Sequence, residues 1–303
     1  MESLRYGILA LVLGGAGVWA SENFFWMMPP PGITPLDFCL TVLAYSIAAA
    51  VALSAVIWSG LGGLAGAFLG GAIMGYMSEG VIVGTIYESM PFQLVWTPLA
   101  WHGLITGGVV LGLGRAGLGP ARMAMIWVLL GLGGCYWAQY WVTERGGVPG
   151  RALFAFYVLG LGLLVPLAQV VLDKMGRLPR PPGWVLLIAP AVAALVWAGQ
   201  TVAETNPVRL VLPAILVLIL WVMRRLGRGT AVLGPGVPVW QHLLFLIAPA
   251  LVVALAPLGW AQGWGSLEAN WVVALPACLV SVAWLGRLIW RAVLKPRSGG
   301  EIA

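Results

Sequence analysis

Hydrophobic residues occur in ten long runs, and short segments between the runs hold nearly all of the charged side chains. A run of about 17 to 22 apolar residues is long enough to cross the hydrocarbon core of a bilayer as a helix. The pattern therefore predicts an all-α integral membrane protein with about ten transmembrane helices. The predicted spans cover residues 6-20, 38-59, 61-77, 95-114, 123-142, 152-172, 184-203, 208-223, 240-260 and 270-289.

Residues 61-94 are the segment in which the pattern is weakest. A glycine-rich run at 61-77 leads into a half-polar stretch at 78-94. Irregular backbone within a membrane is tolerated only where protein or water covers its polar groups. We therefore expect 78-94 either to end the third span or to form a re-entrant or interfacial segment.

The chain is predicted to form a single polytopic membrane domain, 1-303, whose halves differ in composition. The half 1-150 is rich in glycines spaced four residues apart, which let helix backbones approach closely within one protein or at a seam with a second copy. The half 151-303 has a proline in every span, which should kink these helices. The glycines are Gly62, Gly66, Gly70, Gly71, Gly75, Gly103 and Gly107, and the prolines are Pro166, Pro190, Pro213, Pro249, Pro257 and Pro276.

Composition supports the membrane assignment. Hydrophobic residues make up 61% of the chain and charged residues only 9%, whereas soluble domains contain roughly 25% charged residues. This excludes an ordinary soluble domain, and the continuous apolar runs exclude a disordered chain. The net charge of +6 would suggest nucleic-acid binding in a soluble protein, so the position of the basic residues decides its meaning.

The charges divide between the two sides of the predicted membrane. If the N-terminus is cytoplasmic, 13 of the 16 basic residues lie inside and 7 of the 10 acidic residues lie outside, as the positive-inside rule requires. We therefore expect both termini in the cytoplasm, a multi-pass location in a bacterial-type inner (plasma) membrane, and no nucleic-acid partner. The basic residues predicted inside are Arg5, Arg115, Arg122, Lys174, Arg177, Arg180, Arg224, Arg225, Arg228, Arg287, Arg291, Lys295 and Arg297. The acidic residues predicted outside are Glu22, Asp37, Glu79, Glu88, Glu144, Glu204 and Glu268, while Glu2, Asp173 and Glu301 are predicted inside.

The candidate catalytic residues, Glu22, Glu79, Glu88 and His102, all lie toward the outer surface of the first half. Carboxylates and a histidine at a water–lipid boundary can act as general acids and bases. In a straight helix, however, Glu79 and Glu88 would lie on opposite faces, so they meet only if the chain breaks at Gly80 or Gly84. The alternative is a structural His102 hydrogen-bonded to another helix, with carboxylates that are solvated or cap helices.

Aromatic side chains accompany these residues. Most of the 17 tryptophans are expected to anchor the helices at the two interfaces. Trp26, Tyr87, Trp96 and Trp101 are candidates to line a ligand pocket for a flat, lipidic or sugar-bearing molecule. Methionines near His102 could supply soft ligands for copper(I), but the pattern assigns no metal site and no cofactor.

Three functions fit these observations. The first is a membrane-embedded subunit or binding partner of a larger assembly, with membrane lipids and either a protein partner or a second copy as its contacts. The second is an integral-membrane enzyme that acts on a lipid or lipid-linked substrate at the outer leaflet. The third is a facilitative transporter or channel for a neutral solute, since the spans contain no central charged residue of the kind that proton-coupled transport uses.

Overall fold

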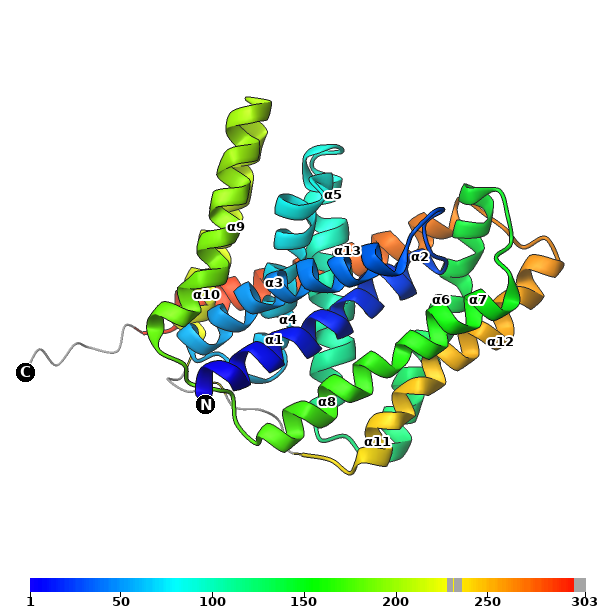
Figure 1. Cartoon of the computed structure of the whole chain (residues 1–303), viewed down its shortest axis with the longest axis horizontal. Coiled ribbons are helices and arrows are strands. Elements are labelled where there is room, and N and C mark those ends of the chain that lie inside the picture. Colours follow the sequence, from blue (N-terminus) through cyan, green and yellow to red (C-terminus); the bar gives the residue numbers. More distant parts are fainter. Residues whose placement is uncertain (228–230, 232–235, 297–303) are drawn as a thin grey trace, which may run out of the picture.

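A computed structural model describes residues 1-227, 231 and 236-296, and this part of the chain contains helices and no strands (Figure 1). The all-helical fold class is thereby confirmed. Three charged residues predicted on the cytoplasmic side, Arg228, Arg297 and Glu301, lie outside the described residues.

The helices of the first half are often interrupted by wide π-helical or tight 3₁₀ turns. Helix α1 (Glu2–Val18) continues through a π-helical turn (Trp19–Asn23) into α2 (Phe24–Trp26), and α3 (Pro35–Ser59) follows. Helix α4 (Gly63–Met77) continues through a second π-helical turn (Ser78–Ile82), and a 3₁₀ turn (Thr85–Tyr87) precedes α5 (Phe92–Val95). A π-helical segment (Trp96–Gly112) and a 3₁₀ turn (Leu113–Arg115) then lead to α6 (Pro120–Arg145).

The second half begins with α7 (Arg151–Ala155), which continues through a π-helical turn (Phe156–Gly160) and a 3₁₀ turn (Leu161–Leu163) into α8 (Leu164–Met175). Helix α9 (Gly183–Glu204) follows, and a 3₁₀ turn (Pro207–Leu210) leads into α10 (Val211–Leu226). The chain ends with α11 (Val239–Leu243), a 3₁₀ turn (Leu244–Leu246), α12 (Ile247–Ala261) and α13 (Ala269–Leu294).

Nine continuous helices in the described residues are long and apolar enough to cross a membrane. They are Glu2–Trp26, Pro35–Ser59, Phe92–Arg115, Pro120–Arg145, Arg151–Met175, Gly183–Glu204, Pro207–Leu226, Val239–Ala261 and Asn270–Leu294. Each contains or overlaps one of the ten predicted spans, which confirms a multi-pass membrane protein. The remaining prediction, 61-77, corresponds to α4, which is not one of the nine, so the number of spans and the side of the termini stay predictions.

Helix α3 shows how local sequence sets a helix boundary. Thr34 accepts a hydrogen bond from the backbone N–H of Asp37, whose carboxylate in turn accepts the backbone N–H of Thr34. This capping box satisfies two otherwise unpaired donors, and Pro35 suits the first helical position. The helix ends at Gly60, which has a left-handed φ of 70° that favours glycine.

The glycine spacing produces close packing between α4 and the Trp96–Gly112 segment. A Cβ on Gly75 would lie 2.5 Å from the carbonyl oxygen of Pro98 and 2.6 Å from the Cβ of His102. A Cβ on Gly71 would lie 2.8 Å from the Cα of Gly107. The close approach that the sequence predicts is therefore present, and it occurs within one chain.

Three of the prolines follow irregular turns. A 3₁₀ turn comes shortly before Pro166 in α8, Pro213 in α10 and Pro249 in α12. Proline has no N–H to donate and clashes with the carbonyl four residues earlier, so the regular hydrogen-bond pattern cannot continue through it.

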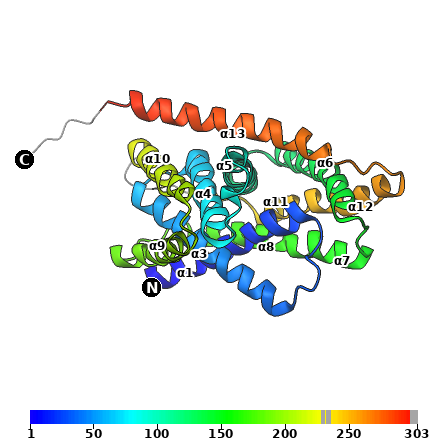
Figure 2. The ribbon, with the colours of Figure 1, turned by 90° about the horizontal axis from the view of Figure 1, so that it is seen from above.

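The helices form a broad bundle with two peripheral members. Helix α9 projects away from the rest (Figure 1), and α13 runs along the opposite side (Figure 2). Only Val185 and Ala193 of α9 are buried, so most of its apolar surface is free to contact lipid.

Each ion pair between described residues joins two residues that the sequence predicts on the same side of the membrane. The inner pairs are Glu2–Arg5, Glu2–Arg177, Asp173–Arg115 and Asp173–His242, and the outer pairs are Glu79–His102 and Glu204–Arg209.

A polar cluster centred on Asp173 joins three helical segments at the end of the bundle that the sequence predicts to be cytoplasmic. The Asp173 carboxylate lies 2.6 Å from the guanidinium of Arg115 and 2.7 Å from Nε2 of His242. Arg115 also donates to the carbonyl oxygen of Gln169. His242 is thus a buried structural residue, distant in the fold from His102.

Candidate functional site

Three π-helical segments hold three of the four predicted catalytic residues. Ser21 and Glu22 lie in the turn Trp19–Asn23, Glu79 in the turn Ser78–Ile82, and His102 in the segment Trp96–Gly112. In the second of these, the N–H of Val83 donates to the carbonyl of Ser78 at 2.9 Å, a bond spanning five residues. Such wide turns are uncommon and occur frequently at functional sites.

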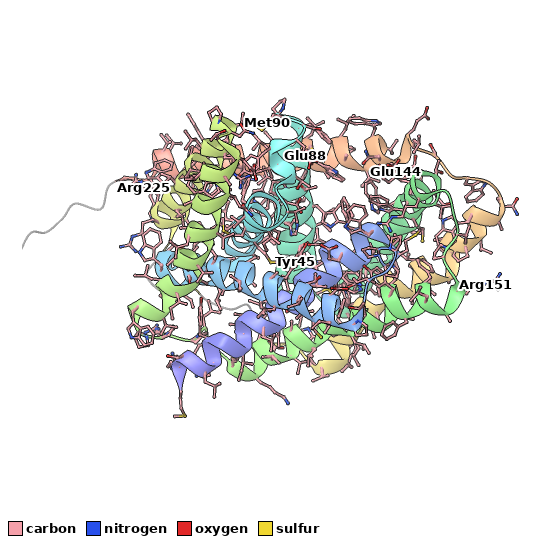
Figure 3. The ribbon with its side chains drawn as sticks, turned by 45° about the horizontal axis from the view of Figure 1, so that its top comes forward. Tyr45, Glu88, Met90, Glu144, Arg151 and Arg225 are labelled. Atoms are coloured by element: carbon pink, nitrogen blue, oxygen red, sulfur yellow. The ribbon has the colours of Figure 1, made fainter. Side chains whose placement is uncertain are left out.

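Glu22, Glu79, Glu88 and His102 all line one cavity of about 300 Å³. Trp26, Trp96 and Trp101 line it as well. Glu88 is exposed at its rim, whereas Tyr45 lies deeper among the helices (Figure 3). Glu88 reaches the cavity because the helix that carries Glu79 ends at Ile82 and the chain turns at Gly84, whose φ is 91°.

His102 is the centre of a chain of hydrogen bonds. Its Nδ1 lies 3.0 Å from Oγ of Ser21, and its Nε2 lies 3.3 Å from Oε1 of Glu79. The hydroxyl of Thr85 donates to the other oxygen of Glu79. Because an ionised carboxylate can only accept, the proton of neutral His102 belongs on Nε2, and Nδ1 is free to accept the Ser21 hydroxyl proton.

Glu22 is held by a different partner. The hydroxyl of Tyr45 donates to Oε1 of Glu22 at 2.7 Å, and the Tyr45 ring stacks on that of His102 at a centroid distance of 6.1 Å. Tyr45 therefore fixes the position of Glu22 and covers one face of the imidazole.

Aromatic rings form much of the cavity wall. Phe25 contacts Trp101 edge to face at 4.4 Å, and Trp26 lies 4.3 Å from Trp141 between ring centroids. The indole N–H groups of Trp101 and Trp137 are used to fix the wall, since they donate to the carbonyls of Ala20 and Phe25 at 2.8 Å and 2.6 Å.

Three polar groups of the lining residues have no hydrogen-bond partner among the described residues. They are the indole N–H of Trp141, a side chain only 6% exposed, the hydroxyl of Thr97 and the side-chain carbonyl oxygen of Gln93. Buried polar groups are normally hydrogen-bonded, so these three are exceptions in the cavity wall.

The ionisable side chains of the cavity are mostly acidic. It is lined by three carboxylates, and His102 is the only basic side chain among the described lining residues. Arg145, which is not a lining residue, lies over the rings of Trp26 and Trp141 at 5.0 Å and 5.5 Å. A concave site of one charge sign raises the local concentration of ligands of the opposite sign.

Comparisons with known proteins give no assignment. No family model, curated protein or solved structure matches the chain. The geometry of this site is therefore the basis for assigning a function.

Tyr87 lies outside the cavity, in a second cluster. Its hydroxyl donates to the carbonyl of Gly80 at 2.9 Å, and the guanidinium of Arg209 lies 4.5 Å from its ring centroid. Burial raises the pKa of the Tyr87 phenol, while the charge of Arg209 acts in the opposite direction. Tyr87 thus helps to hold the turn Pro207–Leu210 that follows α9, and it does not line the cavity.

The methionines do not surround His102. Met27 is buried in the aromatic cluster, whereas Met90 is exposed beside Glu88 (Figure 3). Within the part of the chain that is described, no group of three or more His, Cys, Asp or Glu side chains has the arrangement of a metal site.

Sequence reasoning did not select Ser21, Tyr45 or Thr85. Ser21 and His102 are separated by 81 positions, and their contact depends on the rotation of two helices about their axes. The only signal in the sequence was that Ser21 immediately precedes Glu22 in the same polar segment.

Proposed function

We propose that this protein is an integral-membrane enzyme that uses Glu/His acid–base chemistry on a lipid or lipid-linked substrate. The observation that carries the proposal is that His102 and three carboxylates share one cavity, with His102 hydrogen-bonded to Glu79. The charge distribution of the loops supports a position of this cavity at the outer leaflet of an inner membrane, with both termini in the cytoplasm.

Each polar residue has a role that its contacts support. His102 is the general base, because Nδ1 can accept a proton while Glu79 stabilises the imidazolium that results. Glu22, fixed by Tyr45, and the exposed Glu88 contact the polar part of the substrate. The aromatic wall binds its apolar part.

The test compares membrane vesicles that contain the wild-type protein, His102→Asn or Glu268→Gln. Glu268 is an exposed carboxylate outside the cavity, so Glu268→Gln is the matched control. Untargeted mass spectrometry of the lipids should find at least one species converted by the wild type and the control, with the rate reduced at least about 100-fold in His102→Asn. Identical lipid profiles in all three vesicle preparations would contradict the proposal.

A second candidate is a membrane-embedded subunit that binds a lipophilic cation without transforming it. The three carboxylates and the aromatic wall favour it, since cations bind to the faces of tryptophan rings. Choline should raise the thermal unfolding midpoint of the purified protein, whereas its neutral isostere 3,3-dimethylbutan-1-ol should not. The stabilisation should be lost in Glu22→Gln and Glu88→Gln, and equal effects of the two compounds would exclude this candidate.

A further inference from the structure

From the chain Ser21–His102–Glu79, we propose that Ser21 is a covalent nucleophile and that the protein transfers the acyl group of an ester whose alcohol bears an ammonium group. This inference rests on the proposed enzymatic function and adds to it a nucleophile, a reaction type and a substrate class. Ser21 lies in the π-helical turn Trp19–Asn23 and lines the cavity.

The geometry supplies the three parts that an activated serine needs. The base is His102, whose Nδ1 lies 3.0 Å from Oγ of Ser21, and the orienting carboxylate is Glu79, 3.3 Å from Nε2. Because the Nε2 proton is donated to the Glu79 carboxylate, Nδ1 is the nitrogen that accepts the proton of Ser21. Nucleophilic catalysis typically uses a nucleophile, a base and an orienting group that lie within hydrogen-bond reach of one another.

The hydroxyl of Ser21 is placed for reaction as well as for hydrogen bonding. A serine that only satisfied His102 would not need access to a cavity, but Ser21 reaches this one although its side chain is only 4% exposed. A carbonyl group bound in the cavity would therefore meet a serine that is largely shielded from bulk solvent.

The oxyanion that develops during acyl transfer requires hydrogen-bond donors in the same wall. The indole N–H of Trp141 and the hydroxyl of Thr97 line the cavity without a partner among the described residues. Fixed donors that point to the developing charge stabilise the transition state of acyl transfer.

The substrate class follows from the charge of the cavity. An oxyanion that forms near Glu22, Glu79 and Glu88 is repelled by them, unless the substrate itself brings a positive charge. An ammonium group between Glu22 and Glu88 would neutralise these carboxylates. The same carboxylates would repel a substrate with an anionic head group.

The reaction has two balanced steps. Oγ of Ser21 attacks the ester carbonyl carbon as its proton moves to Nδ1 of His102; the ester C–O bond then breaks, and the alcohol leaves with that proton, so that an acyl-serine remains. A water or acceptor alcohol next gives its proton to Nδ1 and attacks the acyl carbon. The bond to Oγ breaks, Ser21 regains the proton, and a carboxylic acid or a new ester is released.

The experiment uses the purified full-length protein in lipid nanodiscs with a tagged fluorophosphonate, which phosphonylates activated serines and releases fluoride. We expect one label per chain, located on Ser21 by peptide mass spectrometry. The rate should fall at least about 100-fold in His102→Asn and be unchanged in Ser89→Ala, an exposed serine outside the cavity. Choline should slow the labelling, and 3,3-dimethylbutan-1-ol should not.

Ser21→Cys is the control for folding, because it keeps a small polar side chain at this position. Iodoacetamide should alkylate this cysteine faster than the cysteine of the double variant Ser21→Cys with His102→Asn. The assignment of Ser21 as the nucleophile is overturned if the label is found on another serine. It is also overturned if the wild type and His102→Asn are labelled at the same rate. Equal protection by the two small molecules overturns the cationic substrate class. If Ser21→Ala keeps a lipid conversion that His102→Asn loses, the covalent step is wrong while the proposed acid–base enzyme stands.

Discussion

Replacing Gly75 with alanine is expected to destabilise the protein by about 3 kcal/mol, as overpacking of a close contact does. The added methyl group would lie 2.5 Å from the carbonyl oxygen of Pro98 and 2.6 Å from the Cβ of His102. The Pro98 atoms belong to the backbone, which cannot move aside as a flexible side chain can. The thermal unfolding midpoint in detergent should fall sharply, and fluorophosphonate labelling should fall with it, because His102 is displaced.

Gly133→Ala is the matched control for this substitution. Gly133 also lies within a long helix, α6, but a Cβ there would meet no atom within 4 Å. Alanine in a helix interior is favoured over glycine by roughly 0.5–1 kcal/mol, so this variant should be as stable as the wild type or slightly more stable. Equal losses in both variants would show that the glycine seam between α4 and the Trp96–Gly112 segment does not determine stability.

Neutralising Asp173 is expected to lower the free energy of unfolding by about 2 kcal/mol, less than for a fully buried ion pair because the side chain is 16% exposed. Asp173→Asn removes the negative charge between Arg115 and His242, whose side chains are 9% and 3% exposed. A buried cation without its counter-ion is costly. Chemical or thermal unfolding in detergent measures the change.

The double variant Arg115→Met with Asp173→Asn tests the reason for the loss. Removing both charges should recover part of the stability, since an apolar side chain can replace a buried ion pair at little cost. Glu268→Gln, which neutralises an exposed carboxylate, should change the stability by less than about 0.5 kcal/mol. A double variant that is less stable than Asp173→Asn alone would contradict the interpretation.

The hydrophobic pattern was sufficient to predict the helices, and local signals explain their ends. The run 38-59, for example, differs from α3 (Pro35–Ser59) only by the first turn, which the capping residues Thr34 and Asp37 add. The pattern was weakest for α4, because glycines and the polar residues after Met77 reduce its apolar character. A long apolar run identifies a helix that faces lipid. It gives a weaker signal for a helix such as α4, which is covered by other helices and packs through glycines.

The candidate site could be predicted only in part. Glu22, Glu79, Glu88 and His102 were selected from their polarity and predicted side, and the structure places them around one cavity. Their hydrogen bonds could not be predicted, because contacts such as Ser21–His102 depend on helix rotation. The break in the chain that brings Glu88 to the side of Glu79 could be expected from the sequence. Glycine at position 84 permits the positive φ that turns the chain there.

The π-helical turns at Trp19–Asn23 and Ser78–Ile82 each continue a regular α-helix. A π-helical turn is equivalent to one residue inserted into an α-helix, and it rotates the residues after the insertion by about 100° about the helix axis. The face of α4 that packs through Gly71 and Gly75 therefore need not be the face that presents Glu79. The one-residue change in helical phase after Met77 thus lets α4 pack on the Trp96–Gly112 segment through its glycines and still present Glu79 to the cavity.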